Sequence, residues 1–120
     1  MPTGNTFDVP FVSRGKSSDP GDGREIIEEG MITITGNFLI VYEKSEFQEG
    51  SAEAKLVVNL MFMSSVTTQR FHSAGRNYVG GRIVMEGAID QAFSEKLVLK
   101  MELPEYRRMK KALGVATGRF

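Results

Sequence analysis

Residues 56–63 read Leu-Val-Val-Asn-Leu-Met-Phe-Met, the most apolar run in the chain. A strand with one exposed face alternates apolar and polar residues, whereas this run is apolar on both faces, which indicates that both are covered. A buried helix is the alternative, but the run is short for one, and its valines and phenylalanine favour extended backbone. We therefore predict a central strand at residues 56–63, around which the rest of the chain packs.

A hairpin is predicted on the N-terminal side of this strand. Residues 31–35 and 38–42 are rich in β-branched and aromatic side chains and flank Gly36-Asn37. This dipeptide suits a tight turn whose first central residue has a positive φ. The residues that follow, 43–53, are mostly polar and acidic and predict a loop.

A second hairpin is predicted on the C-terminal side. Residues 64–72 alternate weakly, and residues 78–85 form another apolar stretch after a turn-forming Ser-Ala-Gly-Arg-Asn. Gly80 and Gly81 indicate a bulge or a close backbone approach within the second strand.

Residues 88–103 carry two periods at once. A spacing of four, typical of a helix, joins Ile89, Phe93, Leu97 and Met101, whereas a spacing of two, typical of a strand, joins Leu97, Leu99, Met101 and Leu103. We favour a loop or helical turn to residue 95 and a strand over 96–103, with a helix as the alternative.

The C-terminal residues predict a short helix. Pro104 suits the first turn and Gly114 the end. One apolar stripe consists of Tyr106, Met109 and Leu113, and a basic face consists of Arg107, Arg108, Lys110 and Lys111.

Residues 1–23 predict an extended N-terminal arm rather than a core element. They contain three prolines and four glycines. Phe7, Val9 and Phe11 alternate as in a short strand, but Pro10 lacks a ladder donor and restricts that strand to an edge. We therefore expect residues 24–120 to fold as a single β-rich domain without the arm, which would pack on a neighbouring subunit.

These elements predict an α+β fold, mainly an antiparallel β barrel or sandwich of about six strands with a short C-terminal α-helix. A barrel followed by a strand and a short basic helix is similar to the PilZ domain, which receives cyclic dinucleotides. That family's paired arginines lie three apart before the barrel, whereas Arg14 and Arg24 are ten apart here. Residues 31–36 keep only the glycine of its Asp/Asn-x-Ser-x-x-Gly turn, so we transfer no ligand role.

Composition limits the compartment and the partners. The 120 residues suit one domain, and the 15 basic and 15 acidic residues leave no net charge to draw the whole protein to nucleic acid or to an anionic membrane. No apolar leader precedes Arg14, and no run approaches the roughly 18 residues that span a bilayer. Without cysteine, a reducing compartment is favoured. We expect a cytoplasmic protein, or a particle made in a cytoplasm, with no membrane partner.

Several catalytic chemistries lack their residues. His72 is the only histidine and there is no cysteine, which argues against a nucleophile–base pair and against the usual zinc sites. Residues 75–82 have the glycine spacing of a phosphate loop, but Gly81 and Arg82 replace its Lys and Ser/Thr. We therefore expect no enzyme, no metal site and no cofactor.

One local cluster combines basic and aromatic side chains without an acid: Arg70, Phe71, His72, Arg76, Tyr78 and Arg82. Such strands can stack bases and track phosphates, so a single-stranded nucleic-acid-binding module is one hypothesis. It requires Arg70, Arg76 and Arg82 to converge near a hairpin tip. The alternative interpretation is a solvated tip with Phe71 in the core.

The charge layout favours another function. Residues 1–65 hold five basic and ten acidic side chains, and residues 66–120 hold ten and five. A bipolar chain suits self-association. The leading hypothesis is therefore a non-catalytic structural protein that forms a homo-oligomer, such as a subunit of a viral or other repetitive particle, with Phe7, Val9 and Phe11 in its assembly arm.

The predicted buried strand can be tested with Val58→Asp. An unpaired carboxylate in the core costs several kcal/mol against a total stability of roughly 5–15 kcal/mol. We expect this variant to be unfolded in a thermal melt, and a melting curve that matches the parent would contradict the buried strand.

Overall fold

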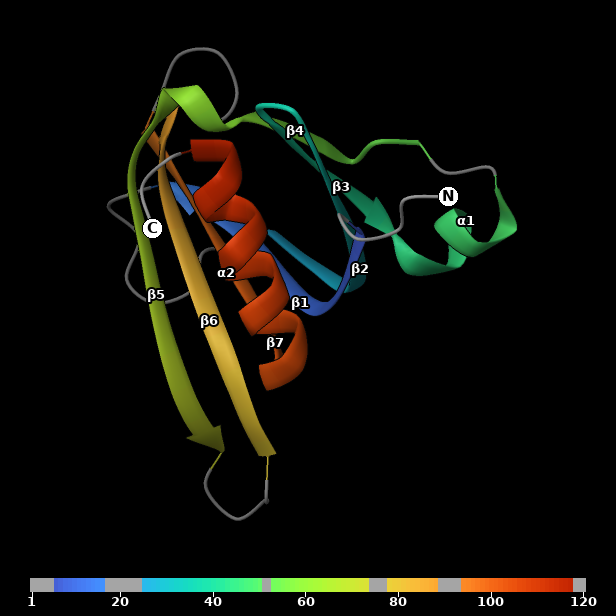
Figure 1. Ribbon diagram of the computed structural model, residues 1–120. Coiled ribbons are helices and arrows are strands. Elements are labelled where there is room, and N and C mark those ends of the chain that lie inside the picture. The colour runs from blue at the N-terminus through green and yellow to red at the C-terminus, as the bar shows by residue number, and fades with distance from the viewer. Residues whose placement is uncertain (1–5, 17–24, 51–52, 74–77, 89–93, 118–120) are drawn as a thin grey trace.

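The computed structural model describes residues 6–16, 25–50, 53–73, 78–88 and 94–117. They form one seven-stranded antiparallel sheet with a C-terminal helix across it (Figure 1), which confirms the α+β prediction. The strands are β1 (Thr6–Lys16), β2 (Glu25–Thr35), β3 (Phe38–Glu43), β4 (Leu56–Asn59), β5 (Met63–Ser73), β6 (Tyr78–Ala88) and β7 (Ser94–Glu102). The helices are α1 (Lys44–Glu49), the single 3-10 turn η1 (Leu60–Phe62) and α2 (Leu103–Thr117).

The strands follow the order β4-β3-β2-β1-β7-β6-β5. Strands β1 to β4 form one meander and β5 to β7 form a second one. The two meanders join where β1 pairs with β7, from Phe11 opposite Lys100 to Lys16 opposite Glu95. Strand β1 is therefore the middle strand of the sheet.

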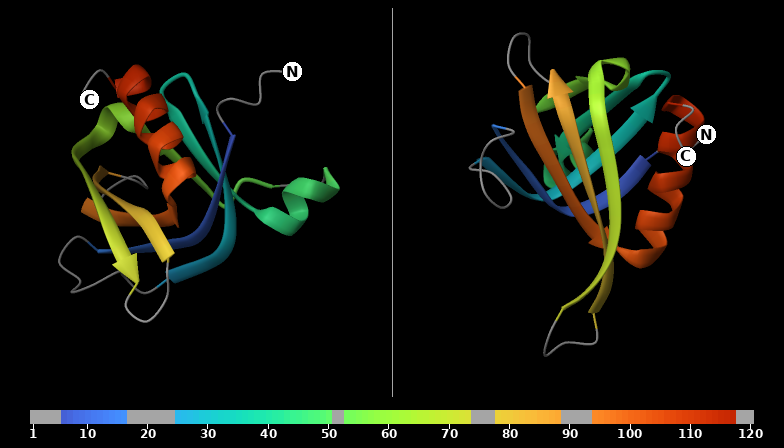
Figure 2. Two further views of the ribbon diagram at one scale, coloured as in Figure 1. Left: turned by 60° about the horizontal axis from the view of Figure 1, so that its bottom comes forward. Right: turned by 90° about the vertical axis from the view of Figure 1, so that its left-hand side faces the viewer.

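The sheet curls strongly, because its two edge strands are joined by η1 alone. In a flat sheet of seven strands, β4 and β5 would lie about 29 Å apart, at roughly 4.8 Å per strand. The chain from Asn59 to Met63 spans at most about 14 Å. The two edge strands, β4 and β5, must therefore approach each other near η1. Figure 2 shows the sheet curving round so that α2 lies between its two edges.

The concave face of the curled sheet holds the core. Tyr106, Met109 and Leu113 point into it from α2 and are almost completely buried, which confirms the predicted apolar stripe. Residues from every strand complete it, among them Phe7, Ile32, Leu39, Val58, Met63, Ile83 and Leu99.

Helix α2 lies close to the sheet because Gly81 has no side chain. A Cβ at this position would lie 1.9 Å from Cγ of Tyr106, so the tyrosine ring occupies that space. The prediction of a close approach at Gly80-Gly81 is confirmed for Gly81.

The prediction of a central strand at residues 56–63 is wrong. The run divides into β4 at the edge of the sheet, η1, and the first residue of β5. The run is not covered on both faces, because several of its apolar side chains lie at the surface: Val57 is 46% exposed, Met61 70% and Phe62 63%. Val58 is nevertheless fully buried, so Val57→Asp is a matched control for Val58→Asp.

The prediction of an N-terminal arm outside the core is wrong for residues 6–16, and the remainder of 1–23 lies outside the described residues. Phe7 and Val9 are fully buried on the central strand. Pro10 is tolerated because the β7 ladder begins only at Phe11, and the β2 ladder skips Pro10 and the opposite Glu29, whose φ is 52°. Deletion of residues 1–23 would remove the strand that joins the two meanders.

The other local predictions have mixed outcomes. The Gly36 turn, with φ of 57°, is confirmed, and so is the strand predicted over residues 96–103, except that Leu103 begins α2. The predicted acidic loop contains α1, where the Phe47 and Tyr42 rings lie 5.4 Å apart and Gly50 ends the helix with φ of 76°. Gly114 does not end α2, which continues to Thr117. Residues 89–93 lie outside the described part.

The packing of Gly81 against Tyr106 predicts a clear effect of Gly81→Ala. The added methyl group overpacks the contact, so we expect a loss of about 1–3 kcal/mol of stability, measured by urea unfolding. The Gly81→Ala/Tyr106→Ala double variant should lose less than the sum of its single variants, because the clash is gone. Additive losses would contradict this packing.

Candidate functional site

The predicted basic and aromatic cluster is divided between β5 and β6. Arg70, Phe71 and His72 lie in β5, and Tyr78 and Arg82 lie in β6. Arg76 lies outside the described residues, as do the side chains of Phe71, His72 and Tyr78.

Arg70 and Arg82 lie on opposite faces of the sheet. Arg70 pairs with Gly81, and Arg82 pairs with Gln69. Directly opposed residues share a face, and successive residues alternate. Because Gly81 faces Tyr106, Arg70 lies on the α2 side and Arg82 on the outer side. The expected convergence of these two charges is therefore wrong.

The predicted arm residues lie within their own chain. Phe7 and Val9 belong to the core. Phe11 is half-buried, and the Lys100 ammonium lies 4.7 Å from its ring centroid. This placement leaves Phe7 and Val9 no surface with which to contact a neighbouring subunit.

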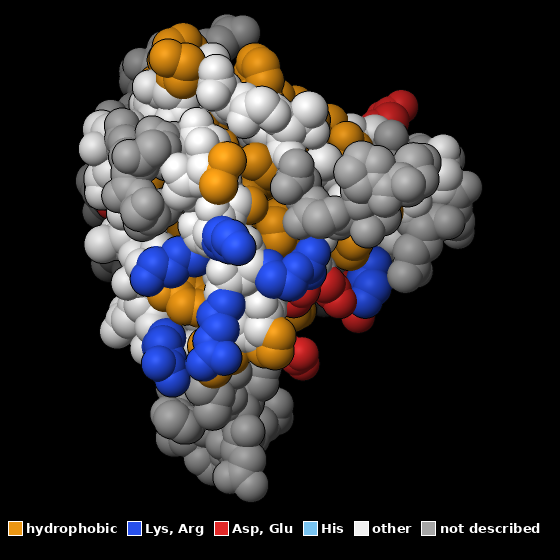
Figure 3. Space-filling model, viewed as in Figure 1, with side chains coloured by type: hydrophobic (Ala, Val, Ile, Leu, Met, Phe, Trp, Pro, Cys, Tyr) orange, Lys and Arg blue, Asp and Glu red, His pale blue; other side chains and the backbone are white. Residues whose placement is uncertain are grey.

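The densest basic surface of the described residues lies on α2. Arg107, Lys110 and Lys111 are exposed, and Figure 3 shows blue side chains gathered over this helix. Arg108 is held in place: it forms an ion pair with Glu105, donates to the Thr6 carbonyl at 3.4 Å and lies 5.0 Å from the Phe7 ring. Glu105 in turn accepts a hydrogen bond from the Asp8 backbone at 2.9 Å.

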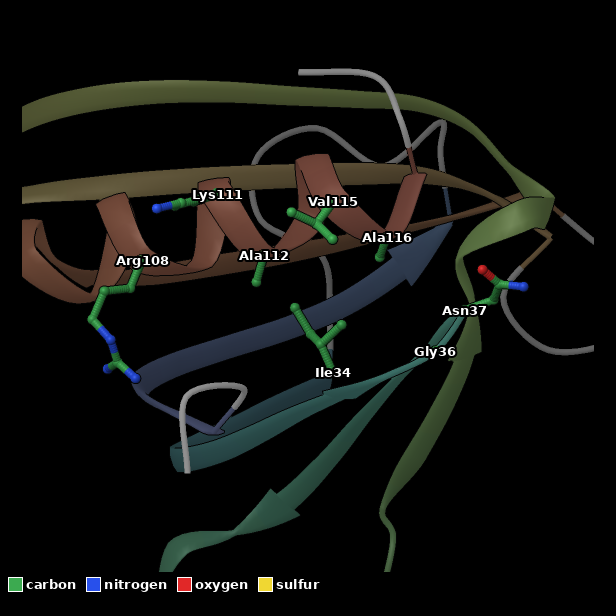
Figure 4. Close-up of a pocket in the computed structure, with 8 residues that line it drawn as sticks. All are labelled: Ile34, Gly36, Asn37, Arg108, Lys111, Ala112, Val115 and Ala116. Carbon is green, nitrogen blue, oxygen red and sulfur yellow. The ribbon is translucent and has the colours of Figure 1, made fainter. Parts of the chain in front are cut away.

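An open cavity of about 540 Å³ lies between α2 and the turn that joins β2 to β3. Figure 4 shows its lining, which consists of Ile34, Gly36, Asn37, Arg108, Lys111, Ala112, Val115 and Ala116. The walls are apolar, and both cations come from α2. These lining residues include no acid, histidine or hydroxyl side chain.

The two edges of the sheet differ in length. Strand β4 has four residues and ends in η1, whereas β5 has 11 residues and pairs only with β6 among the described strands. From Ser64 to Gln69, β5 has no proline, glycine or charged residue. It contains one irregularity, a bulge at Ser64, whose hydroxyl donates to the Glu86 carbonyl at 3.0 Å.

Other kinds of site find little support. Within the described ranges, no group of three or more His, Cys, Asp or Glu side chains could hold a metal ion. None of the described helices is both long enough and apolar enough to cross a bilayer. Comparison of the chain with protein families, with curated proteins and with solved structures found no match. The candidate surfaces are therefore the β5 edge, the basic side of α2 and the cavity beside it.

Sequence reasoning singled out neither the β5 edge nor the cavity. The edge position of β5 follows from the pairing of β1 with β7, which no local pattern encodes. The cavity depends on the distance between α2 and the β2–β3 turn, and the one local signal is the pair of small residues Ala112 and Ala116.

Proposed function

We propose that the protein is a non-catalytic structural protein that self-associates through the edge of β5. One observation carries the proposal: β5 is a long edge strand that, apart from a bulge at its first residues, has no proline and no charged side chain from Ser64 to Gln69. An unpaired edge presents a row of backbone donors and acceptors, which pair readily with another strand. Natural proteins protect such edges with lysine, proline, short strands or bulges.

The contrast with β4 supports this proposal. Strand β4 is protected by its length of four residues and by the chain turning away into η1. On β5, the bulge at Ser64 disturbs the pairing only between Met63 and Ser65. The six residues from 64 to 69 are uncharged. Thr67 and Gln69 are exposed as well.

A two-fold axis through Thr67 gives a self-complementary antiparallel pair, because such an axis leaves each copy's outer face on the same side of the joined sheet. In this register Thr67 lies opposite Thr67 of the second copy, and opposed threonines are a favourable cross-strand pair. Arg70 lies opposite Ser64 of the second copy. The two Arg70 residues are then about 20 Å apart along the strands, at roughly 3.4 Å per residue, so their repulsion is largely screened.

The remaining features are consistent with assembly. The cavity lining contains no carboxylate, histidine or hydroxyl side chain. The absence of cysteine favours a cytoplasmic protein, or a particle assembled in a cytoplasm. The association does not use residues 6–16, which complete the chain's own sheet.

Substitution Thr67→Lys tests this assembly. It places two ammonium groups close together across the proposed axis, so we expect the parent to sediment as a dimer or larger species and the variant as a monomer. Thr35→Lys is the matched control, because Thr35 is also exposed but lies on the inner strand β2, and it should sediment as the parent does. A parent that is monomeric at all accessible concentrations, or a folded Thr67→Lys variant that associates normally, would refute the proposal.

The exposed basic side of α2 supports binding of single-stranded nucleic acid as a second candidate. Arg107, Lys110 and Lys111 lie on one helix, whereas Arg70 and Arg82 are separated by the sheet.

Salt titration of oligonucleotide binding tests the second candidate. The triple variant Arg107→Ser/Lys110→Ser/Lys111→Ser should lower the slope of the logarithm of the binding constant against the logarithm of salt concentration by about two, at roughly 0.7 per phosphate contact. The double variant Arg70→Ser/Arg82→Ser should lower this slope by no more than about 0.7. A single-stranded nucleic acid follows one face of the sheet and can therefore contact only one of these two arginines. Circular dichroism serves as the folding control. Equal effects of the two variants, or no salt-sensitive binding by the parent, would exclude this surface.

A further inference from the structure

The cavity between α2 and the β2–β3 turn takes no part in the proposed association. In Figure 1, β5 lies to one side of α2 and the β2–β3 hairpin to the other. A molecule in the cavity therefore leaves the β5 edge accessible. We propose that this cavity binds a small amphipathic anion, which consists of an aliphatic or aromatic body and one acidic head group.

The size and the walls of the cavity fit the apolar body. Its volume of about 540 Å³ is within the roughly 300–1,000 Å³ of small-molecule sites. Ile34 of β2 faces Ala112 and Ala116 of α2 across it (Figure 4). Val115 lies at the rim with 83% of its surface exposed. An apolar body in the cavity would remove this side chain and the walls from water, which favours binding.

The charges of the lining select the acidic head. Arg108 and Lys111 are one turn apart on α2 and line the cavity together, with no acid among the described lining residues. The Arg108 charge is shared with Glu105. Lys111 is exposed and therefore provides the cation that can turn toward a ligand.

The helix also sets the orientation of the ligand. The C-terminal end of a helix carries partial negative charge, which disfavours an anion near Ala116 and beyond. The head group therefore lies at Lys111 and Arg108, in the middle of α2. The apolar body extends past Ala112 and Val115 toward Asn37, whose side-chain amide lies 3.4 Å from the Met61 sulfur.

The fluorescent probe 8-anilinonaphthalene-1-sulfonate, an aromatic anion, provides the binding assay on the full chain. Octanoate and octylammonium have equal apolar chains and opposite charges, and both are used below their micellar concentrations. We expect octanoate to displace the probe at least tenfold more effectively than octylammonium. Equal displacement by the two compounds, or no displacement by octanoate, would overturn the proposal. Repetition with octyl phosphate distinguishes a carboxylate preference from a phosphate preference within the same ligand class.

Two variants locate the site. Lys111→Gln should weaken octanoate binding by about tenfold, the loss of one charge-assisted hydrogen bond. Lys110→Gln is the matched control, because Lys110 is the neighbouring exposed lysine and does not line this cavity. Val115→Glu should abolish binding by placing an acid at the rim, and its high exposure makes the fold insensitive to the change. Equal affinities of Lys111→Gln and Lys110→Gln would place binding elsewhere and refute the site.

The same variants separate this proposal from self-association. Lys111→Gln should sediment as the parent does, and Thr67→Lys should bind octanoate as the parent does, because the two sites lie on different elements. Failure of either proposal therefore leaves the other unaffected.

Discussion

The pairing of β1 with β7 is the interaction on which the rest of the structure depends. It joins two meanders, each of which is only three or four strands wide, into one sheet with a continuous concave face. The Arg14 guanidinium lies 3.3 Å from the Glu95 carboxylate near the end of this ladder, and 81 residues of sequence separate the two. Without the joined sheet, α2 would keep its contacts with β6 and β7 but lose those with β1 and β2, so its apolar stripe would be covered on one side only.

The fold class was predictable because alternation and turn residues are local signals. The strand positions within the sheet were not, since an apolar run does not show which strand is central, nor, in this chain, which of its side chains are buried. Residues 56–63 are the most apolar run yet contain an edge strand and an exposed turn, with Met61 and Phe62 at the surface. Pro10 correctly indicated a missing ladder bond. The missing donor of Pro10 leaves no partner in β7 without a hydrogen bond, because the pairing of β1 with β7 begins one residue later, at Phe11.

The candidate sites were less predictable than the fold, because faces depend on register. Arg70 and Arg82 occupy neighbouring strands, and their separation by the sheet follows from the pairing of Arg70 with Gly81. The basic face of α2 was readable from helical spacing, and the structure leaves Arg107, Lys110 and Lys111 exposed on it. Arg108 differs from them because it packs on Phe7 and pairs with Glu105, contacts that only the tertiary structure provides.

The central place of β1 also determines when the sheet can be completed during synthesis. Strand β1 leaves the ribosome first, yet one of its two neighbours, β7, begins at Ser94 of the 120 residues. Non-local pairings of this kind form slowly, because a long loop must close before they contribute. Until then β1 keeps an unpaired apolar edge. In this interval the backbone donors and acceptors on that side of β1 are open to pairing with strands of other chains, so early folding intermediates are the species most exposed to aggregation.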